Sequence, residues 1–173
     1  MMRVLVLGAT GRAGAAIITE LPASSEVTAA LRTASDADRL PELSQGLAAR
    51  VVDIDYVASL RTAAHDVEVV VNAIRLREDI APGALVHLHD RIHATAPDAW
   101  IVTVGGAGSL HLPGGRRFWE QPSFPAQTLP RGIAHARLRN HLESGAAGER
   151  WTYLIPPACL RPGWSRHLAV QAD

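Results

Sequence analysis

The sequence predicts an α/β fold in which one parallel sheet is covered by helices on both faces. Short apolar runs without polar alternation, typical of strands buried on both sides, alternate with segments of helical length. A glycine-rich turn joins the first apolar run to the first helical segment. The 173 residues, 47% hydrophobic and 20% charged, suit one globular domain. We therefore expect a single domain over residues 1–173, with right-handed crossovers and strand order 3-2-1-4-5-6.

The first half of the chain supplies three strands and three helices. We expect strands at Arg3–Leu7, Glu26–Leu31 and Ala49–Asp53, and helices from about Gly11 to Leu21 and at Asp36–Leu43 and Ala58–Ala64. The first helix ends before Pro22, because proline lacks the N–H that a helix interior needs.

The second half continues the alternation and adds one long loop. We expect strands at Glu68–Asn72, Trp100–Val104 and Trp151–Ile155, and helices at Leu85–Thr95 and Leu129–Ser144. Leu85, Leu88 and Ile92 form one apolar stripe on their helix. The segment Gly105–Gln127 reads as a loop, and loops of this length in compact domains are usually functional or mobile.

The turn Gly8-Ala9-Thr10-Gly11-Arg12-Ala13-Gly14 predicts a dinucleotide site. Gly8 permits a tight turn, Gly11 lets the backbone approach a pyrophosphate, and Gly14 lets helix and strand pack closely. The helix N-terminus then offers free N–H groups to the anion. An ordinary glycine-rich turn is the alternative, and the strand–turn–helix context favours the dinucleotide.

The residues after the second strand indicate which dinucleotide binds. An acid there accepts a hydrogen bond from the 2′-hydroxyl of NAD, whereas an arginine pairs with the 2′-phosphate of NADP. This chain has Arg32 and no acid before Asp36, and Arg12 could add a second guanidinium. Both arginines could instead be solvated surface residues. We favour NADP(H).

Three further segments should line the crevice at the carboxyl ends of the strands. Asp53-Ile54 could accept from the adenine amino group, or Asp53 could cap its own loop. Asn72-Ala73 should form the crevice floor. Gly105-Gly106-Ala107-Gly108 should let the backbone pass close to a nicotinamide ring.

Three segments together resemble a known group of proteins. The glycine turn, Val102–Leu110 and Trp151–Ala158 are similar to the atypical short-chain dehydrogenase/reductases, which have the Rossmann fold. The nearest branch is the NmrA-like, NAD(P)H-binding group that includes NADH-flavin reductases, and biliverdin reductase B is a more distant likeness. The resemblance covers residues 3 to 163.

The resemblance implies a role for each part of the crevice. It places the pyrophosphate at Gly8, Thr10, Gly11, Arg12 and Gly14, the 2′-phosphate at Arg32, the adenine at Asp53 and Ile54, the central ribose at Asn72 and Ala73, and the nicotinamide near Gly105, Gly106 and Pro156.

The catalytic residues of that family are not matched. All seventeen basic residues are arginine, so no Tyr-x-x-x-Lys pair exists, and Gly106 occupies the position of the family's serine. His135 lies on the helix that carries the family's tyrosine and is a candidate proton donor, as is His111 on the long loop.

The chain also ends soon after Pro162-Gly163, where relatives continue with a further strand and helix. We therefore expect a shortened C-terminal substrate part. It should leave apolar surface near Trp151, Tyr153 and Trp164, covered by a second copy in a homodimer.

Other clusters have simpler interpretations. His87, His89 and His93 share a helix, and a solvated or interface face is favoured over a metal site, so no metal is expected. Phe118, Trp119 and Phe124 could stack on a planar substrate or pack against their own domain. Cys159 reads as a buried apolar residue rather than a nucleophile.

Composition restricts the partners and the compartment. A formal net charge of zero argues against a nucleic-acid or anionic-membrane surface. No apolar run is long enough to span a bilayer, no signal-peptide pattern is present, and a single cysteine fits a reducing compartment, so we expect a cytoplasmic protein.

The favoured function is an NADPH-dependent reductase that transfers hydride to a flavin, quinone or similar conjugated small molecule. Two alternatives stay open. One is a non-catalytic NADP(H)-binding sensor or scaffold, and the other is a non-redox isomerase or cyclase of a biosynthetic pathway on the same fold.

Overall fold

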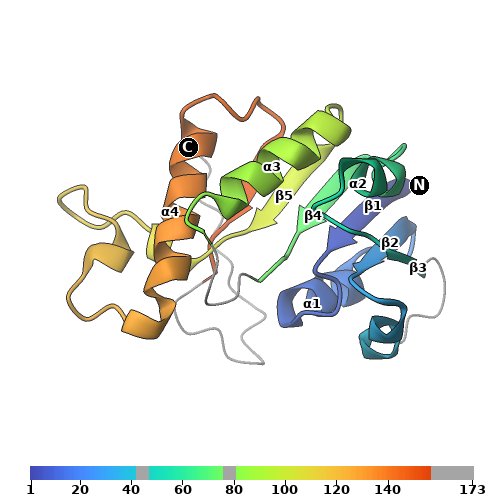
Figure 1. Ribbon diagram of the computed structural model, residues 1–173, viewed down its shortest axis with the longest axis horizontal. Helices are drawn as coiled ribbons and strands as arrows, with labels where there is room; N and C mark the ends of the chain where they lie inside the picture. The colour runs from blue at the N-terminus through green and yellow to red at the C-terminus, as the bar shows by residue number, and fades with distance from the viewer. Residues whose placement is uncertain (42–46, 76–80, 157–173) are drawn as a thin grey trace.

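The computed structural model describes residues 1–41, 47–75 and 81–156. Its strands form one parallel sheet in the order β3-β2-β1-β4-β5-β6, which confirms the predicted topology (Figure 1). The strands are β1 (Met2–Leu7), β2 (Ser25–Leu31), β3 (Leu47–Val51), β4 (Val69–Asn72), β5 (Trp100–Val104) and β6 (Trp151–Leu154).

Helices cover both faces of this sheet. They are α1 (Arg12–Glu20), α2 (Val57–Ala63), α3 (Ala84–Thr95) and α4 (Leu129–Glu143). Ile18 of α1 packs with Val4 and Val6 on one face. On the other face, α2 and α3 pack against the alternate residues of β1, such as Leu5, and α4 continues this layer beside α3 (Figure 1). Alternate strand residues thus belong to two different cores, as the apolar runs predict.

Two predicted elements have different bounds. The third strand is Leu47–Val51 rather than Ala49–Asp53, so Asp53 lies beyond the strand end. The helix predicted at Asp36–Leu43 is a 3₁₀ helix, η1, at Ala34–Arg39. It begins earlier because Thr33 and Asp36 form a reciprocal capping box. The other strands and helices match their predicted bounds within one residue.

The long loop after β5 is ordered by contacts with α4. It contains three short 3₁₀ helices, η2 (Ala107–Ser109), η3 (Phe118–Glu120) and η4 (Ala126–Thr128). Arg117, only 9% exposed, donates to the Ser109 carbonyl at 2.8 Å and to the Asn140 side chain on α4. A buried, paired guanidinium of this kind fixes the path of the loop.

The loop aromatics pack within their own domain. The Phe118 and Phe124 rings meet edge to face with centroids 5.4 Å apart. A Cβ on Gly132 of α4 would lie 2.9 Å from both Phe124 and Trp119, so this glycine lets the loop approach the helix. Of the two predictions for these side chains, the structure favours packing over an open stacking platform.

Candidate functional site

The predicted site residues lie at the carboxyl edge of the sheet. Since the strands are parallel, the turns that follow β1, β4, β5 and β6 all open on this edge. The glycine turn, Asn72-Ala73, Gly105-Gly106 and Pro156 are therefore brought to the same side of the molecule.

The glycine turn is closed tightly against the end of β4. The Gly11 N–H donates to the Gly8 carbonyl at 3.0 Å, and Gly8 has a φ of 77°. A Cβ on Gly8 would lie 2.6 Å from the Ala73 carbonyl oxygen, and one on Gly14 would lie 2.2 Å from that of Gly8. Gly8 and Gly14 are thus required by backbone contacts, as predicted for a turn that draws helix and strand together.

The N-terminus of α1 is left open to an anion. Gly11 is the N-cap, no side chain caps the helix, and the first turn contains no acidic residue. The first-turn N–H groups and the positive end of the helix dipole therefore face the crevice without a side-chain partner. This arrangement fits a bound pyrophosphate.

Two of the predicted cofactor-binding side chains are arginines, and the acid that follows β2 is held by its own turn. Arg12 and Arg32 are both exposed. The Asp36 carboxylate accepts from the Thr33 N–H at 3.1 Å and from its hydroxyl at 2.9 Å, and these bonds lower the pKa of Asp36. This acid is therefore engaged in capping η1 rather than free to accept from a ribose.

Arg39, which the sequence analysis did not identify, is a third arginine near this site. Its guanidinium pairs with Asp36 at 3.0 Å and reaches back to the Thr10 carbonyl in the glycine turn at 3.5 Å. The signal that could have found it is the Thr33-Ala34-Ser35-Asp36 capping pattern, which predicts a helical turn that carries Arg39 toward the turn after β1.

Asp53 serves its own loop. Its Oδ1 accepts from the Asp55 N–H at 2.9 Å, and its N–H donates to the Ser59 hydroxyl at 3.0 Å. Arg91 of α3 holds the same loop through the Ile54 carbonyl, at 2.5 Å, and the Asp55 carboxylate, at 3.0 Å. The capping role expected as an alternative is therefore present, and the adenine contact stays a prediction.

Asn72 is buried at the end of β4, and its predicted place on the crevice floor stays a prediction. The side chain is 1% exposed, and its Oδ1 accepts from the Ile74 N–H at 3.3 Å. Its Nδ2 has no hydrogen-bond partner among the described residues. Asn72 thus shapes the turn after β4, which also carries Ala73 against Gly8.

The glycines after β5 make room for protein side chains. A Cβ on Gly105 would lie 2.4 Å from the Tyr153 ring, and one on Gly106 would lie 2.7 Å from the His135 ring. We expected these glycines to make room for a nicotinamide. The structure seats a tyrosine of β6 and a histidine of α4 directly against them, at the end of the crevice where the resemblance places that ring, and the nicotinamide contact stays a prediction.

His135 and Tyr153 form a hydrogen-bonded pair, which we call the His135–Tyr153 pair. The Tyr153 hydroxyl lies 3.1 Å from His135 Nδ1. Burial and the Arg131 charge lower the pKa of His135 to about 4, and burial raises the pKa of Tyr153. Both groups are therefore neutral at pH 7. Sequence analysis missed Tyr153 because no lysine follows it at the family's spacing.

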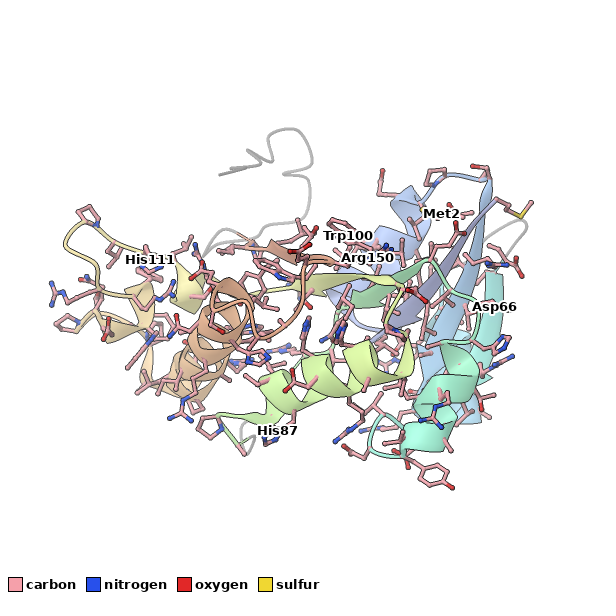
Figure 2. All side chains as sticks on the ribbon, turned by 90° about the horizontal axis from the view of Figure 1, so that it is seen from above. Met2, Asp66, His87, Trp100, His111 and Arg150 are labelled. Carbon is pink, nitrogen blue, oxygen red and sulfur yellow. The ribbon has the colours of Figure 1, made fainter. Side chains whose placement is uncertain are left out.

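His111 is not brought to this pair. It lies on the outer loop (Figure 2), exposed, with its Nε2 4.0 Å from a Glu143 carboxylate oxygen. His135 precedes Glu143 by eight residues on α4, or about 12 Å at the usual helical rise. The geometry does not support His111 as a proton donor at the same site.

The helix with three histidines differs from expectation. His87 is exposed (Figure 2), but His89 is fully buried, and neither of its ring nitrogens makes a hydrogen bond within the described segments. Burial lowers the pKa of His89, and its ring meets that of His141 edge-on, with centroids 6.2 Å apart. Of the predicted solvated or interface face, the solvated alternative is wrong for His89, because this side of α3 packs against α4.

The apolar surface beside β6 also lies elsewhere than predicted. Trp151 and Tyr153 pack toward α4, whereas Trp100 and Leu154 are 43% and 42% exposed on the other face. Pro157, Cys159, Pro162, Gly163 and Trp164 lie outside the described residues. Across residues 1–41, 47–75 and 81–156, no helix is long and apolar enough to cross a membrane, and no three metal-binding side chains are grouped to hold an ion.

Comparisons with known proteins agree with this geometry. The family model described as NAD(P)H-binding matches residues 8–169. No curated protein matches the chain. Among solved structures, a candidate epimerase from Bacteroides thetaiotaomicron is 23% identical with a TM-score of 0.76, covering 94% of this chain and 74% of its own.

Two further structures share the fold. A candidate NADH-flavin reductase from Streptococcus pneumoniae is 24% identical with a TM-score of 0.70, covering 91% of this chain and 73% of its own. A short-chain dehydrogenase from Burkholderia cenocepacia, in complex with NADP, is 17% identical with a TM-score of 0.58, covering 89% and 70%. The predicted fold and the predicted membership of an NAD(P)H-binding family are confirmed.

Proposed function

Because the chain belongs to the NAD(P)H-binding family, we propose that it is an NADPH-dependent reductase acting on a flavin, quinone or similar conjugated small molecule. When bound, a reduced nicotinamide supplies hydride. The chain's residues fit the cofactor: backbone contacts require Gly8 and Gly14, and the first turn of α1 offers uncapped N–H groups to a pyrophosphate. The names of the candidate NADH-flavin reductase and the NADP-bound dehydrogenase support this proposal.

The observation that carries the proposal is the neutral His135–Tyr153 pair against Gly106, in a chain without lysine. Ordinary carbonyl reduction in the wider family relies on a tyrosine acidified by lysine, which this chain lacks. A conjugated acceptor needs less help, because the charge left by hydride transfer is delocalised over its ring system. Catalysis then rests on holding the acceptor in position and offering it a hydrogen bond.

The preference for NADPH rests on the three arginines near the glycine turn. Arg12 and Arg32 are exposed, and Arg39 is held near the Thr10 carbonyl. Guanidinium groups bind phosphate through charge-assisted, often bidentate hydrogen bonds. Asp36, the acid nearest in sequence after β2, is engaged with Thr33 and Arg39 and does not oppose a 2′-phosphate.

The test follows NADPH absorbance with FMN, FAD and a set of quinones, alongside thermal shift with NADPH and NADH. Binding should raise the melting temperature by mass action. We expect oxidation of NADPH with at least one conjugated acceptor. If NADPH binds tightly and no acceptor is reduced, the reductase proposal is wrong and a cofactor-binding sensor takes its place.

A further inference from the structure

Two segments, α4 and the turn after β5, hold the Tyr153 side chain. Its hydroxyl lies 3.1 Å from Nδ1 and 3.2 Å from the carbonyl oxygen of His135 on α4, and it accepts from the Gly106 N–H at 3.4 Å. Its ring lies against Gly105, where a Cβ would be 2.4 Å from Cζ. Tyr153 is therefore fixed in one orientation, with its hydroxyl directed at the His135 imidazole.

The other edge of the imidazole lies over the backbone after β5. A Cβ on Gly106 would be 2.7 Å from His135 Cδ2 and 3.3 Å from Nε2. Nε2 makes no hydrogen bond to the described residues. It is also not one of the described side-chain atoms that are both fully buried and unpaired, so solvent can reach it. This nitrogen is thus the one left for a ligand at the carboxyl edge of the sheet.

The hydroxyl has one hydrogen and two hydrogen-bond acceptors, Nδ1 and the carbonyl oxygen of His135. The Ser109 hydroxyl, which partly offsets the burial that raises the pKa of Tyr153, donates its own hydrogen to the Gly106 carbonyl at 2.7 Å. The His135 carbonyl lies inside α4, so it already has a regular helical partner, the N–H four residues further along the chain. His135 Nδ1 has only the Tyr153 hydroxyl among the described residues. A bond from the hydroxyl to Nδ1 therefore satisfies the group that would otherwise be unpaired, which places the ring hydrogen on Nε2.

We propose that Tyr153 is a positioning residue that fixes His135 in the Nε2–H tautomer, so that a neutral imidazole presents an N–H donor beside Gly106. This inference deepens the proposed reductase function and rests on it for its catalytic meaning. The low pKa of His135, about 4, keeps the imidazole uncharged, and the raised pKa of Tyr153 makes the phenol a poor acid.

The role of the donor follows from the charge balance of the reaction. The hydride that the cofactor supplies adds an electron pair to the conjugated acceptor, and a proton from water completes the reduced product. His135 Nε2–H donates a hydrogen bond to the charge as it develops and keeps its own proton. A fixed donor aimed at developing charge stabilises a transition state without reorganisation.

The first test reads the tautomer directly and needs no turnover. Histidine-labelled protein is examined by long-range ¹H–¹⁵N correlation at pH 7, with His135→Gln identifying the signal. We expect the Nε2–H pattern in the wild type and a mixture, or the Nδ1–H pattern, in Tyr153→Phe. Tyr56→Phe, which removes an exposed hydroxyl, should leave the His135 signal unchanged. An Nδ1–H pattern in the wild type, or the same tautomer in Tyr153→Phe, overturns the proposal.

The second test separates positioning from structure. Tyr153→Phe keeps the ring that fills the space beside Gly105, so it should fold and bind NADPH as the wild type does. We expect its kcat with the best acceptor to fall by about tenfold, with KM for NADPH unchanged. An unchanged kcat overturns the positioning role. A wild type that reduces no acceptor overturns the proposed function instead, and the tautomer measurement still decides the geometry.

Discussion

At the residue scale, Arg32 should decide cofactor choice. It follows β2, the place where dinucleotide-binding folds recognise the ribose 2′ group, and Arg39 pairs with Asp36 in the next turn. We expect the wild type to bind NADPH roughly tenfold to a hundredfold more tightly than NADH. Arg32→Glu should abolish this preference, whereas Arg116→Glu on the outer loop should keep it. Equal dissociation constants for the two cofactors in the wild type would contradict this prediction.

Buried histidines should make stability depend on pH. The folded-state pKa of His135, about 4, lies below its ordinary value of 6.5, and burial also lowers the pKa of His89. As pH falls below 6.5, the unfolded chain binds protons that the folded protein does not, so stability decreases until the folded-state pKa is reached. For His135 the loss between pH 6.5 and 4 is at most about 3 kcal/mol, at about 1.4 kcal/mol per pKa unit.

Urea unfolding at pH 7 and pH 5 measures this effect. We expect the difference in unfolding free energy between the two pH values to shrink in His135→Gln and in His89→Gln. His87→Gln, at an exposed position on the same helix as His89, should keep the wild-type difference. The same pH dependence in all four proteins would show that neither buried histidine is responsible.

At the scale of elements, the turn between β1 and α1 depends on backbone contact. A Cβ on Gly14 would lie 2.2 Å from the Gly8 carbonyl oxygen, and no rotamer change can relieve a clash with backbone. Gly14→Ala should therefore destabilise the fold by about 3 kcal/mol or more. Gly115→Ala is the matched control, since Gly115 has a φ of 81° and nothing within 4 Å of its Cβ position.

The control should cost only the conformational strain of a positive φ, about 1 kcal/mol. Thermal unfolding of both variants and the wild type measures the difference. If Gly14→Ala melted no lower than Gly115→Ala, the close packing of helix and strand described here would be wrong. A folded Gly14→Ala protein should also bind NADPH more weakly, because α1 must move away from the turn.

At the scale of the whole molecule, one sheet face bears directly on assembly. Trp100 and Leu154 project from β5 and β6 on the α1 side and are 43% and 42% exposed, with the Trp100 Nε1–H donating to the Thr152 hydroxyl at 2.8 Å. Val104 pairs with Leu154 and lies on the same side of β5 as Trp100, so we expect a homodimer through this apolar face. Light scattering at micromolar concentration tests it. Leu154→Arg should give a monomer, whereas the control Val51→Arg, on the exposed edge strand β3, should stay a dimer. A monomeric wild type contradicts the prediction.

Much of the fold could be predicted because its signals are local. Unbroken apolar runs, the helical stripe of Leu85, Leu88 and Ile92, and the glycine turn each lie within one short segment, and together they predict the observed strand order. The bounds that differ belong to edge elements, β3 and η1, where capping and exposure compete with the apolar pattern.

The sequence by itself determined the parallel sheet, its strand order and the NAD(P)H-binding family, because apolar periodicity and glycine spacing are properties of short, continuous segments. Tertiary structure alone decided which side chains share space. It paired Tyr153 with His135, turned Arg39 to Thr10 and buried His89 between α3 and α4. Such contacts join residues 18 or 29 positions apart, so they depend on how whole elements pack and on no pattern within either segment.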